Sequence, residues 1–157
     1  MGAAKVYVET SVISYLTARP SRDLVVAAHQ QLTQEWWAVR DRFELFVSEA
    51  VLEEAAAGQP QAAAERLVAL AGIAVLGVSS AVSDLSQLLL KSSAMPMKAA
   101  IDAVHVAVAA ANGMDFLLTW NCKHIANAAT RGKIEQTCRL AGFTPPVICT
   151  PEELGEV

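Results

Sequence analysis

The sequence predicts a three-layer α/β/α domain, in which a short parallel sheet lies between two layers of helices. Short apolar or β-rich runs alternate with longer segments of helical periodicity along all 157 residues, and this alternation is typical of a parallel sheet covered on both faces. Hydrophobic residues make up 54% of the chain, which is enough for one sizeable core, and the length does not require a second domain. We therefore expect a single domain over residues 1–157.

The first third of the chain predicts a strand, a short helix and a long helix. Residues 5–8 form a β-rich run, and a polar turn separates it from a short apolar helix at 12–16. After a break at Pro20, Ser21 is placed to cap a long amphipathic helix that continues to about Arg42. Its expected inward residues are Leu24, Val25, Ala28, Leu32, Trp36 and Val39. The adjacent Trp36 and Trp37 cannot both face the core.

The middle of the chain repeats the alternation of strand and helix. A strand at 43–47 precedes Ser48, which is placed to cap a helix at 49–57 that Gly58 ends. A further helix at 61–71 leads into a strand at 73–76, and Ser79 and Ser80 introduce a helix at 81–91 with apolar residues at helical spacing.

The stretch from 98 to 127 is the part of the chain most informative about a functional site. It predicts an apolar helix ended by Asn112 and Gly113, then a short buried strand at 116–118, then polar residues where that strand ends. In open parallel sheets, ligands bind at this edge. A helix at 130–141, a strand at 147–149 and a capped turn starting at Thr150 complete the chain.

Charge and cysteine content narrow the functional classes. With 16 acidic and 12 basic residues the net charge is −4, so nucleic-acid contact would need a local basic patch or bridging metal ions. The three cysteines form no CxxC pair, which argues against a disulfide scaffold or a structural zinc site. Glycines break the longest apolar runs and no signal segment is apparent, so we expect no membrane span and a cytoplasmic location.

Polar residues at the ends of predicted elements form the candidate site. Glu9 follows the first strand and Asn121 follows the fourth, so a parallel sheet places both at one edge. Helices that begin at this edge can bring Glu54 and Asp102 close to them. Several carboxylates in one cleft repel each other, and a hard divalent cation such as Mg²⁺ or Mn²⁺ relieves that repulsion. Such a site hydrolyses phosphodiesters.

Three of these residues also have an ordinary structural explanation. Glu9 suits the first turn of a helix, Asn121 suits a turn, and Glu54 lies beside Glu49 and Glu53 on a helix whose exposed face should be acidic.

Asp102 differs from the others, because its neighbours are almost wholly apolar and a buried carboxylate is costly unless it is paired or coordinated. The first turn of a helix is nevertheless also a common place for aspartate. We interpret His105, on the same helix, as a satisfied histidine on a half-buried face rather than as a base.

Four segments in order resemble PIN-domain proteins, in particular the ribonuclease toxins of VapBC-type toxin–antitoxin pairs. The segments are Val6–Ser11, Ser48–Glu54 followed by Gly58, Asp102–Ala107 and Leu117–Asn121. Their order and spacing cover the chain from about Val6 to Val147.

The resemblance implies that Glu9, Glu54 and Asp102 are metal-binding acids and that Asn121 occupies the fourth acidic position. Glu53 is an alternative to Glu54, but the four-residue step from Glu54 to the following glycine fits the family better.

The resemblance also implies that Thr10, Ser11 and Thr119 support the site with their hydroxyl groups. Two positions depart from the family. Glu9 stands where aspartate is usual, so the metal would sit differently or bind through water, and Asn121 lowers the negative charge by one.

By this resemblance the chain is a Mg²⁺- or Mn²⁺-dependent endoribonuclease that acts on RNA, pairs with an antitoxin protein and forms a homodimer. Its basic residues nearest the predicted site edge are Arg19, Arg22, Lys98, Lys123 and Arg131. The alternative from another class is a PIN-like binding or assembly module without nuclease activity, which the departures at positions 9 and 121 motivate.

Other enzymes built on similar sheets fit the sequence less well. A receiver domain requires an acidic pair after the first strand and a phosphorylatable aspartate after the third, where the chain has Thr10-Ser11 and Gly77-Val78-Ser79. A haloacid-dehalogenase-like phosphatase requires Asp-x-Asp after the first strand, where the chain has Glu9-Thr10-Ser11. A dinucleotide-binding fold requires a GxGxxG motif, which the chain lacks.

Overall fold

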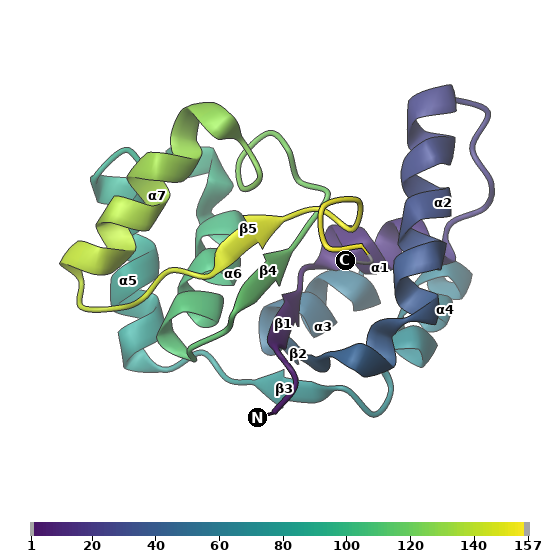
Figure 1. Cartoon of the computed structure of the whole chain (residues 1–157), viewed down its shortest axis with the longest axis horizontal. Helices are drawn as coiled ribbons and strands as arrows, with labels where there is room; N and C mark the ends of the chain where they lie inside the picture. Colours follow the sequence, from purple (N-terminus) through teal and green to yellow (C-terminus); the bar gives the residue numbers. More distant parts are fainter. Residues whose placement is uncertain (1, 156–157) are drawn as a thin grey trace.

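A parallel sheet of five strands runs through the centre of the computed structural model, which describes residues 2–155 (Figure 1). The strands are β1 Lys5–Val8, β2 Glu44–Ser48, β3 Ala74–Leu76, β4 Phe116–Leu118 and β5 Val147–Cys149. Their order in the sheet is β3-β2-β1-β4-β5, and every pair is parallel. The predicted parallel sheet is thus confirmed.

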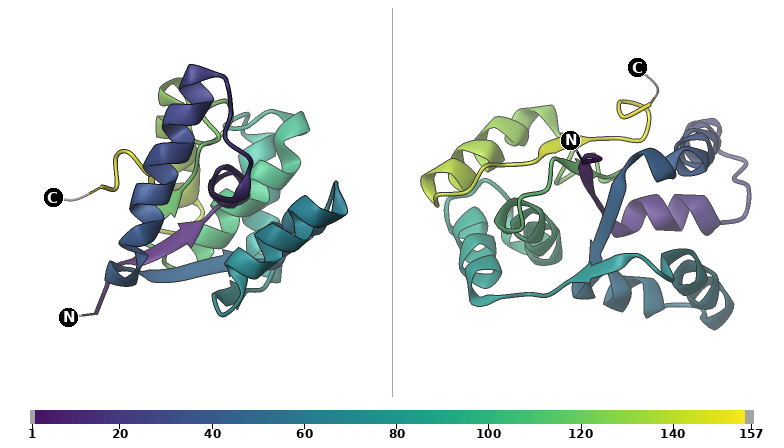
Figure 2. Two further views of the ribbon diagram at one scale, coloured as in Figure 1. Left: turned by 90° about the vertical axis from the view of Figure 1, so that its right-hand side faces the viewer. Right: turned by 60° about the horizontal axis from the view of Figure 1, so that its bottom comes forward.

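Within residues 2–155, seven α-helices flank the sheet in two layers. They are α1 Thr10–Thr17, α2 Leu24–Ala38, α3 Glu49–Ala56, α4 Pro60–Leu70, α5 Ser80–Lys91, α6 Ala100–Ala111 and α7 Ala128–Leu140, with two 3-10 turns, η1 Arg40–Arg42 and η2 Met97–Ala99. Figure 2 shows α1 to α4 gathered on one side and α5 to α7 on the other. The predicted three-layer α/β/α arrangement is confirmed.

The strand order creates a switch point between β1 and β4. From β1 the chain moves outward to β2 and β3, and it then returns across the sheet to β4 and moves outward to β5. The helices that follow β1 and β4 therefore leave the sheet toward opposite faces, and in such folds ligands bind in the crevice outside the carboxyl ends of the strands at this point. The core is deepest here, because Val6, Tyr7 and Val8 of β1 and Leu117 and Leu118 of β4 are fully buried.

Several helix starts follow the capping residues that the sequence predicts. Ser48 accepts the Val51 N–H at 3.4 Å and begins α3, and Ser79 accepts the Val82 N–H at 3.3 Å and begins α5. Gly58 follows α3 with φ of +87°, a conformation in which a side chain is strained. These local signals therefore place α3, which carries Glu54, where the sequence predicts it.

The long helix differs from its prediction at both ends. Asp23, rather than Ser21, caps α2 by accepting the Val26 N–H at 3.0 Å, and the helix ends at Ala38 before the short turn η1. The prediction that Leu24, Val25 and Ala28 face inward is wrong, since Leu24 and Val25 are 86% and 65% exposed and Ala28 is exposed as well. In Figure 1 the first turns of α2 project beyond the rest of the molecule, so they have little to pack against.

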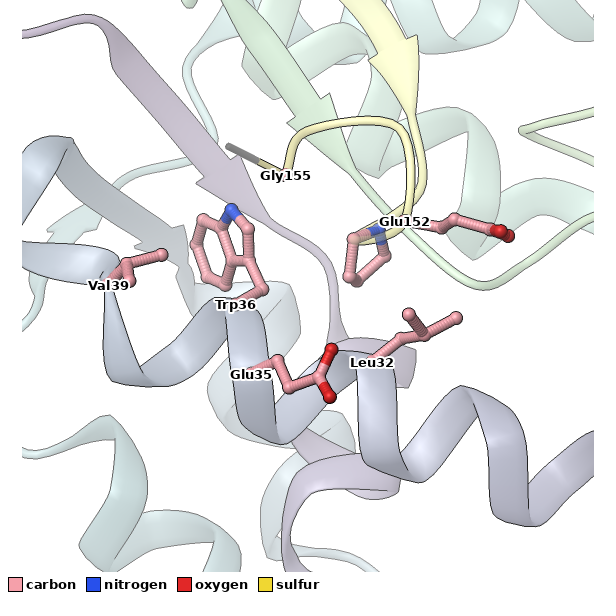
Figure 3. Close-up of a pocket in the computed structure, with 7 residues that line it drawn as sticks. Leu32, Glu35, Trp36, Val39, Glu152 and Gly155 are labelled. Carbon is pink, nitrogen blue, oxygen red and sulfur yellow. The ribbon is translucent and has the colours of Figure 1, made fainter. Parts of the chain in front are cut away.

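Only one of the two adjacent tryptophans reaches the core. Trp36 is 2% exposed and stacks on Phe43 at 5.7 Å, whereas Trp37 is half-buried beneath the Arg40 guanidinium. Figure 3 shows Trp36 beside Glu35 on the wall of a cleft between α2 and the turn at residues 151–155.

The cysteines are free thiols. Burial raises the pKa of Cys138 to about 11 and that of Cys149 to about 12, and Cys122 is exposed. Within residues 2–155, no helix combines the length and the apolar character needed to cross a membrane.

Candidate metal centre

Glu9 lies at the carboxyl end of β1, where two hydroxyl groups hold its buried side chain. Its Oε1 accepts hydrogen bonds from Ser11 Oγ and Thr119 Oγ1, each at 2.5 Å, and its Oε2 accepts the Ser11 N–H at 3.0 Å. These hydroxyls also accept backbone N–H groups, Ser11 from Trp120 at 2.8 Å and Thr119 from Asn121 at 2.9 Å. A hydroxyl has one proton, so each donates that proton to Glu9.

The loop after β4 is anchored to α1 and α2 by Trp120. Its indole N–H donates to Thr33 Oγ1 at 2.7 Å, and its ring stacks on His29 with centroids 4.0 Å apart and planes within 12°. Tyr15 of α1 meets the same ring edge-on at 6.1 Å. This packing fixes the loop that carries Thr119 beside Glu9.

Glu54 enters the same crevice from α3. Its Oε1 accepts hydrogen bonds from Thr10 Oγ1 at 2.6 Å and from His105 Nε2 at 2.5 Å. Burial raises the pKa of Glu54, but its interactions with His105 and Thr10 outweigh burial and hold that pKa below its usual range. The Glu54 carboxylate is therefore ionised at neutral pH. Its neighbour Glu53 is exposed, so of the two side chains it is Glu54 that contacts Thr10 and His105.

His105 of α6 is fully buried behind Glu54. Its Nδ1 lies 2.6 Å from the Tyr7 hydroxyl, which in turn lies 2.7 Å from Ser48 Oγ. Burial raises the pKa of Tyr7 well above its usual range, against the opposing effect of its hydrogen bond with Ser48, so the phenol keeps its proton. The interpretation of His105 as half-buried is corrected by its complete burial, although it is a satisfied histidine as expected.

Glu9, Glu54 and His105 together form a group that could hold a metal ion. One ligand atom from each lies within 4.8 Å of the other two. Two carboxylates so close repel each other, and a divalent cation bound through oxygen relieves that repulsion. The imidazole nitrogen is a ligand that suits transition metals better than Mg²⁺. The donor set therefore fits a divalent cation.

The other two predicted site residues lie outside this group. Asp102 is half-buried in the first turn of α6, three residues before His105, and its carboxylate makes no hydrogen bond or ion pair within residues 2–155. Asn121 shapes the loop after β4, because its Oδ1 accepts the His124 N–H at 3.1 Å and its carbonyl accepts the Ala126 N–H at 2.8 Å.

The three predicted supporting hydroxyls all contact the carboxylates, since Thr10 donates to Glu54 and both Ser11 and Thr119 donate to Glu9. Sequence reasoning missed Tyr7, Ser48 and the contact of His105 with Glu54. One available signal was the three-residue spacing from Asp102 to His105, which places both side chains on one side of the helix.

Comparison with known proteins gives structural matches and no sequence matches. No protein-family model matches the chain, and no curated protein is significantly similar to it in sequence. One chain of VapBC2 from Rickettsia felis, solved bound to a DNA fragment from its promoter, superposes with a TM-score of 0.60 at 12% identity, covering 93% of this chain and 98% of that one. VapC20 of Mycobacterium tuberculosis, a toxin that cleaves the sarcin–ricin loop, superposes with a TM-score of 0.54 at 18% identity, covering 88% and 96%.

These similarities extend over nearly the whole length of each matched chain. They confirm the resemblance to VapC-type PIN domains at the level of the fold.

Proposed function

We propose that the protein is a divalent-metal-dependent endoribonuclease, the toxin of a toxin–antitoxin pair. The observation that carries the proposal is the meeting of Glu9 and Glu54, with His105 behind Glu54, in the crevice of a VapC-like PIN fold. An RNA substrate, an antitoxin partner, a homodimeric assembly and a cytoplasmic location belong to the same proposal.

The two carboxylates are arranged to hold Mg²⁺ or Mn²⁺. Hydroxyl and imidazole donors hold Oε1 of Glu9 and Oε1 of Glu54, whereas Oε2 of Glu54 has no hydrogen-bond partner within residues 2–155. We assign Glu9 and Glu54 as metal ligands, with Asp102 as a further ligand through water. The metal, when bound, supplies an activated water and neutralises charge on the phosphate.

The side chains around the carboxylates take supporting roles in this proposal. Thr10, Ser11 and Thr119 keep the carboxylates oriented through their hydroxyl groups. Asn121 orients a water or a phosphate oxygen with its amide N–H groups, because its Oδ1 is already engaged in the loop.

A cleft between α1 and α4 provides a path for the RNA backbone. Most of its lining residues are polar, and they include the exposed Arg19, the exposed acidic Glu65 and the half-buried Arg66. Arg66 donates to the Ala55 carbonyl at 2.9 Å and to the Ala57 carbonyl at 2.6 Å, so it holds the end of α3. Arg19 is therefore the side chain we assign to phosphate contact.

The test is RNA cleavage by matched acid variants. Glu54→Gln removes a proposed ligand, whereas Glu53→Gln removes the adjacent exposed charge from the same helix. We expect Glu54→Gln, Asp102→Asn and EDTA each to abolish cleavage and Glu53→Gln to leave it intact. Cleavage that survives both Glu54→Gln and EDTA would refute the mechanism. For the toxin role, we expect growth arrest on overexpression that a neighbouring gene product relieves.

The second candidate is a PIN-like binding or assembly module without nuclease activity. It is favoured by the position of Asp102 outside the group that could hold metal and by the engagement of Asn121 Oδ1 in its own loop. Calorimetric titration with Mn²⁺ separates the two candidates, because an inactive scaffold should bind the ion negligibly.

A further inference from the structure

His105 lies at the centre of a buried hydrogen-bond chain that connects the sheet to the candidate site. The chain runs from Ser48 Oγ to the Tyr7 hydroxyl at 2.7 Å, on to His105 Nδ1 at 2.6 Å, and from His105 Nε2 to Glu54 Oε1 at 2.5 Å. Ser48, Tyr7 and His105 are each fully buried. These residues come from β2, β1 and α6, so three separate elements determine where the imidazole lies.

The neighbours of the ring decide where its proton lies. Glu54 Oε1 already accepts the Thr10 hydroxyl at 2.6 Å, so this oxygen acts as an acceptor and the proton shared with His105 belongs to Nε2. With the Nε2 proton directed at Glu54, Nδ1 is free to accept the Tyr7 hydroxyl, 2.6 Å away. Ser48 can then donate to the Tyr7 oxygen, and each group in the chain has a partner.

We propose that His105 is a positioning residue that holds Glu54 Oε1 through its Nε2–H, so that Oε2 is presented to the metal. Tyr7 and Ser48 fix the ring in the tautomer that makes this contact. The consequence for metal binding rests on the function proposed above, whereas the hydrogen bond and the tautomer do not.

The Oε1 atoms of the two carboxylates are supported in the same way, although Glu9 Oε2 also accepts the Ser11 N–H at 3.0 Å. Glu9 Oε1 is held by Ser11 and Thr119, and Glu54 Oε1 is held by Thr10 and His105. Each carboxylate thus has one oxygen fixed by two side-chain donors. His105 takes the place that a hydroxyl occupies beside Glu9, which assigns it to orientation rather than to direct metal coordination.

The tautomer is measured on the metal-free wild-type protein by ¹⁵N NMR of the imidazole side chains. The protein has three histidines, and the imidazole signal that disappears in His105→Gln identifies His105. We expect Nε2 of His105 to carry a proton. An unprotonated Nε2 would overturn the proposal, and this result does not depend on whether the protein binds metal or cleaves RNA.

The positioning role is measured by Mn²⁺ calorimetry on two matched variants. Glutamine places an amide N–H near the position of Nε2, whereas asparagine reaches only the position of Nδ1. We expect His105→Asn to weaken Mn²⁺ binding by about 10- to 100-fold, as is typical for loss of an outer-shell partner. We expect His105→Gln to retain most of the affinity.

Two results on metal binding would overturn the positioning role. One is equal affinity in wild type, His105→Asn and His105→Gln, with thermal unfolding confirming that all three are folded. The other is an electron-spin-echo spectrum of bound Mn²⁺ with direct coupling to the His105 nitrogen, which would make His105 a ligand. Failure of the wild type to bind Mn²⁺ would instead refute the proposed function, and the tautomer measurement would still decide the inference.

Discussion

Removal of one buried hydroxyl group, in Tyr7→Phe, is expected to destabilise the protein substantially. The Tyr7 hydroxyl contacts both His105 Nδ1 at 2.6 Å and Ser48 Oγ at 2.7 Å, and all three side chains are buried. Its loss leaves two buried polar groups without this partner, each at a cost of about 1–3 kcal/mol. Ser48 still accepts the Val51 N–H, so the cost of leaving Ser48 without the Tyr7 hydroxyl falls at the lower end of that range. The expected loss in the free energy of unfolding is about 2–4 kcal/mol.

Thermal and urea unfolding measure this loss. For a domain of this size, 1 kcal/mol corresponds to about 2–4 °C in Tm, so Tyr7→Phe should unfold about 4–16 °C lower than wild type. Tyr15→Phe is the matched control, because the half-buried Tyr15 makes no side-chain hydrogen bond within residues 2–155. Its expected effect is within about 0.5 kcal/mol. Equal stability of Tyr7→Phe and Tyr15→Phe would refute the buried hydrogen-bond chain.

Three further predictions address the loop, the pH dependence and the RNA path. Trp120→Phe keeps an aromatic ring over His29 but loses the 2.7 Å bond to Thr33, so urea unfolding should show a loss of about 1–2 kcal/mol; unchanged stability would contradict the anchoring role. The folded-state pKa of Glu54 is below its usual range despite burial, so the stability that it contributes is present at neutral pH and lost as pH falls through that pKa. As the pH is lowered, the urea midpoint of Glu54→Gln should therefore fall less steeply than that of wild type. Identical slopes of midpoint against pH in the two proteins would argue against the prediction. Arg19→Ala should weaken RNA binding equally for all sequences and lower by about 1 the slope of log binding constant against log salt concentration. Arg22→Ala, outside the cleft, should change neither quantity. A loss that depends on RNA sequence would exclude a phosphate contact at Arg19.

The position of Glu9 and Thr119 could be predicted from the sequence because it depends on strand geometry. Residues that follow parallel strands meet at one edge, and both strands are marked by short buried runs. The Ser48 cap likewise fixes the start of α3, and with it the position of Glu54. These signals are local, and they agree with the structure.

The sequence could not predict which face of α6 meets α3, and this limited the prediction of the site. The helix is apolar almost all round, from Ala103 to Ala110, so it has no polar stripe that would show which face meets α3. The choice between Asp102 and His105 as the neighbour of Glu54 depends on packing against α5 and the sheet. Metal binding by Asp102 stays a prediction.

The start of α2 was misplaced for a different reason. Ser21 and Asp23 are both good capping residues, and the sequence offers no basis for choosing between them. Apolar Leu24 and Val25 suggested an inward face, but the first turns of α2 project beyond the rest of the molecule.

Diffraction from crystals soaked in Mn²⁺ tests whether Glu9 and Glu54 hold a metal ion together. We expect an anomalous peak in the crevice between β1 and β4, bonded to Glu54 Oε2 and to Glu9, with His105 still hydrogen-bonded to Glu54 Oε1. A crevice without a peak at saturating Mn²⁺, or an ion bound only at sites remote from Glu9 and Glu54, would contradict it.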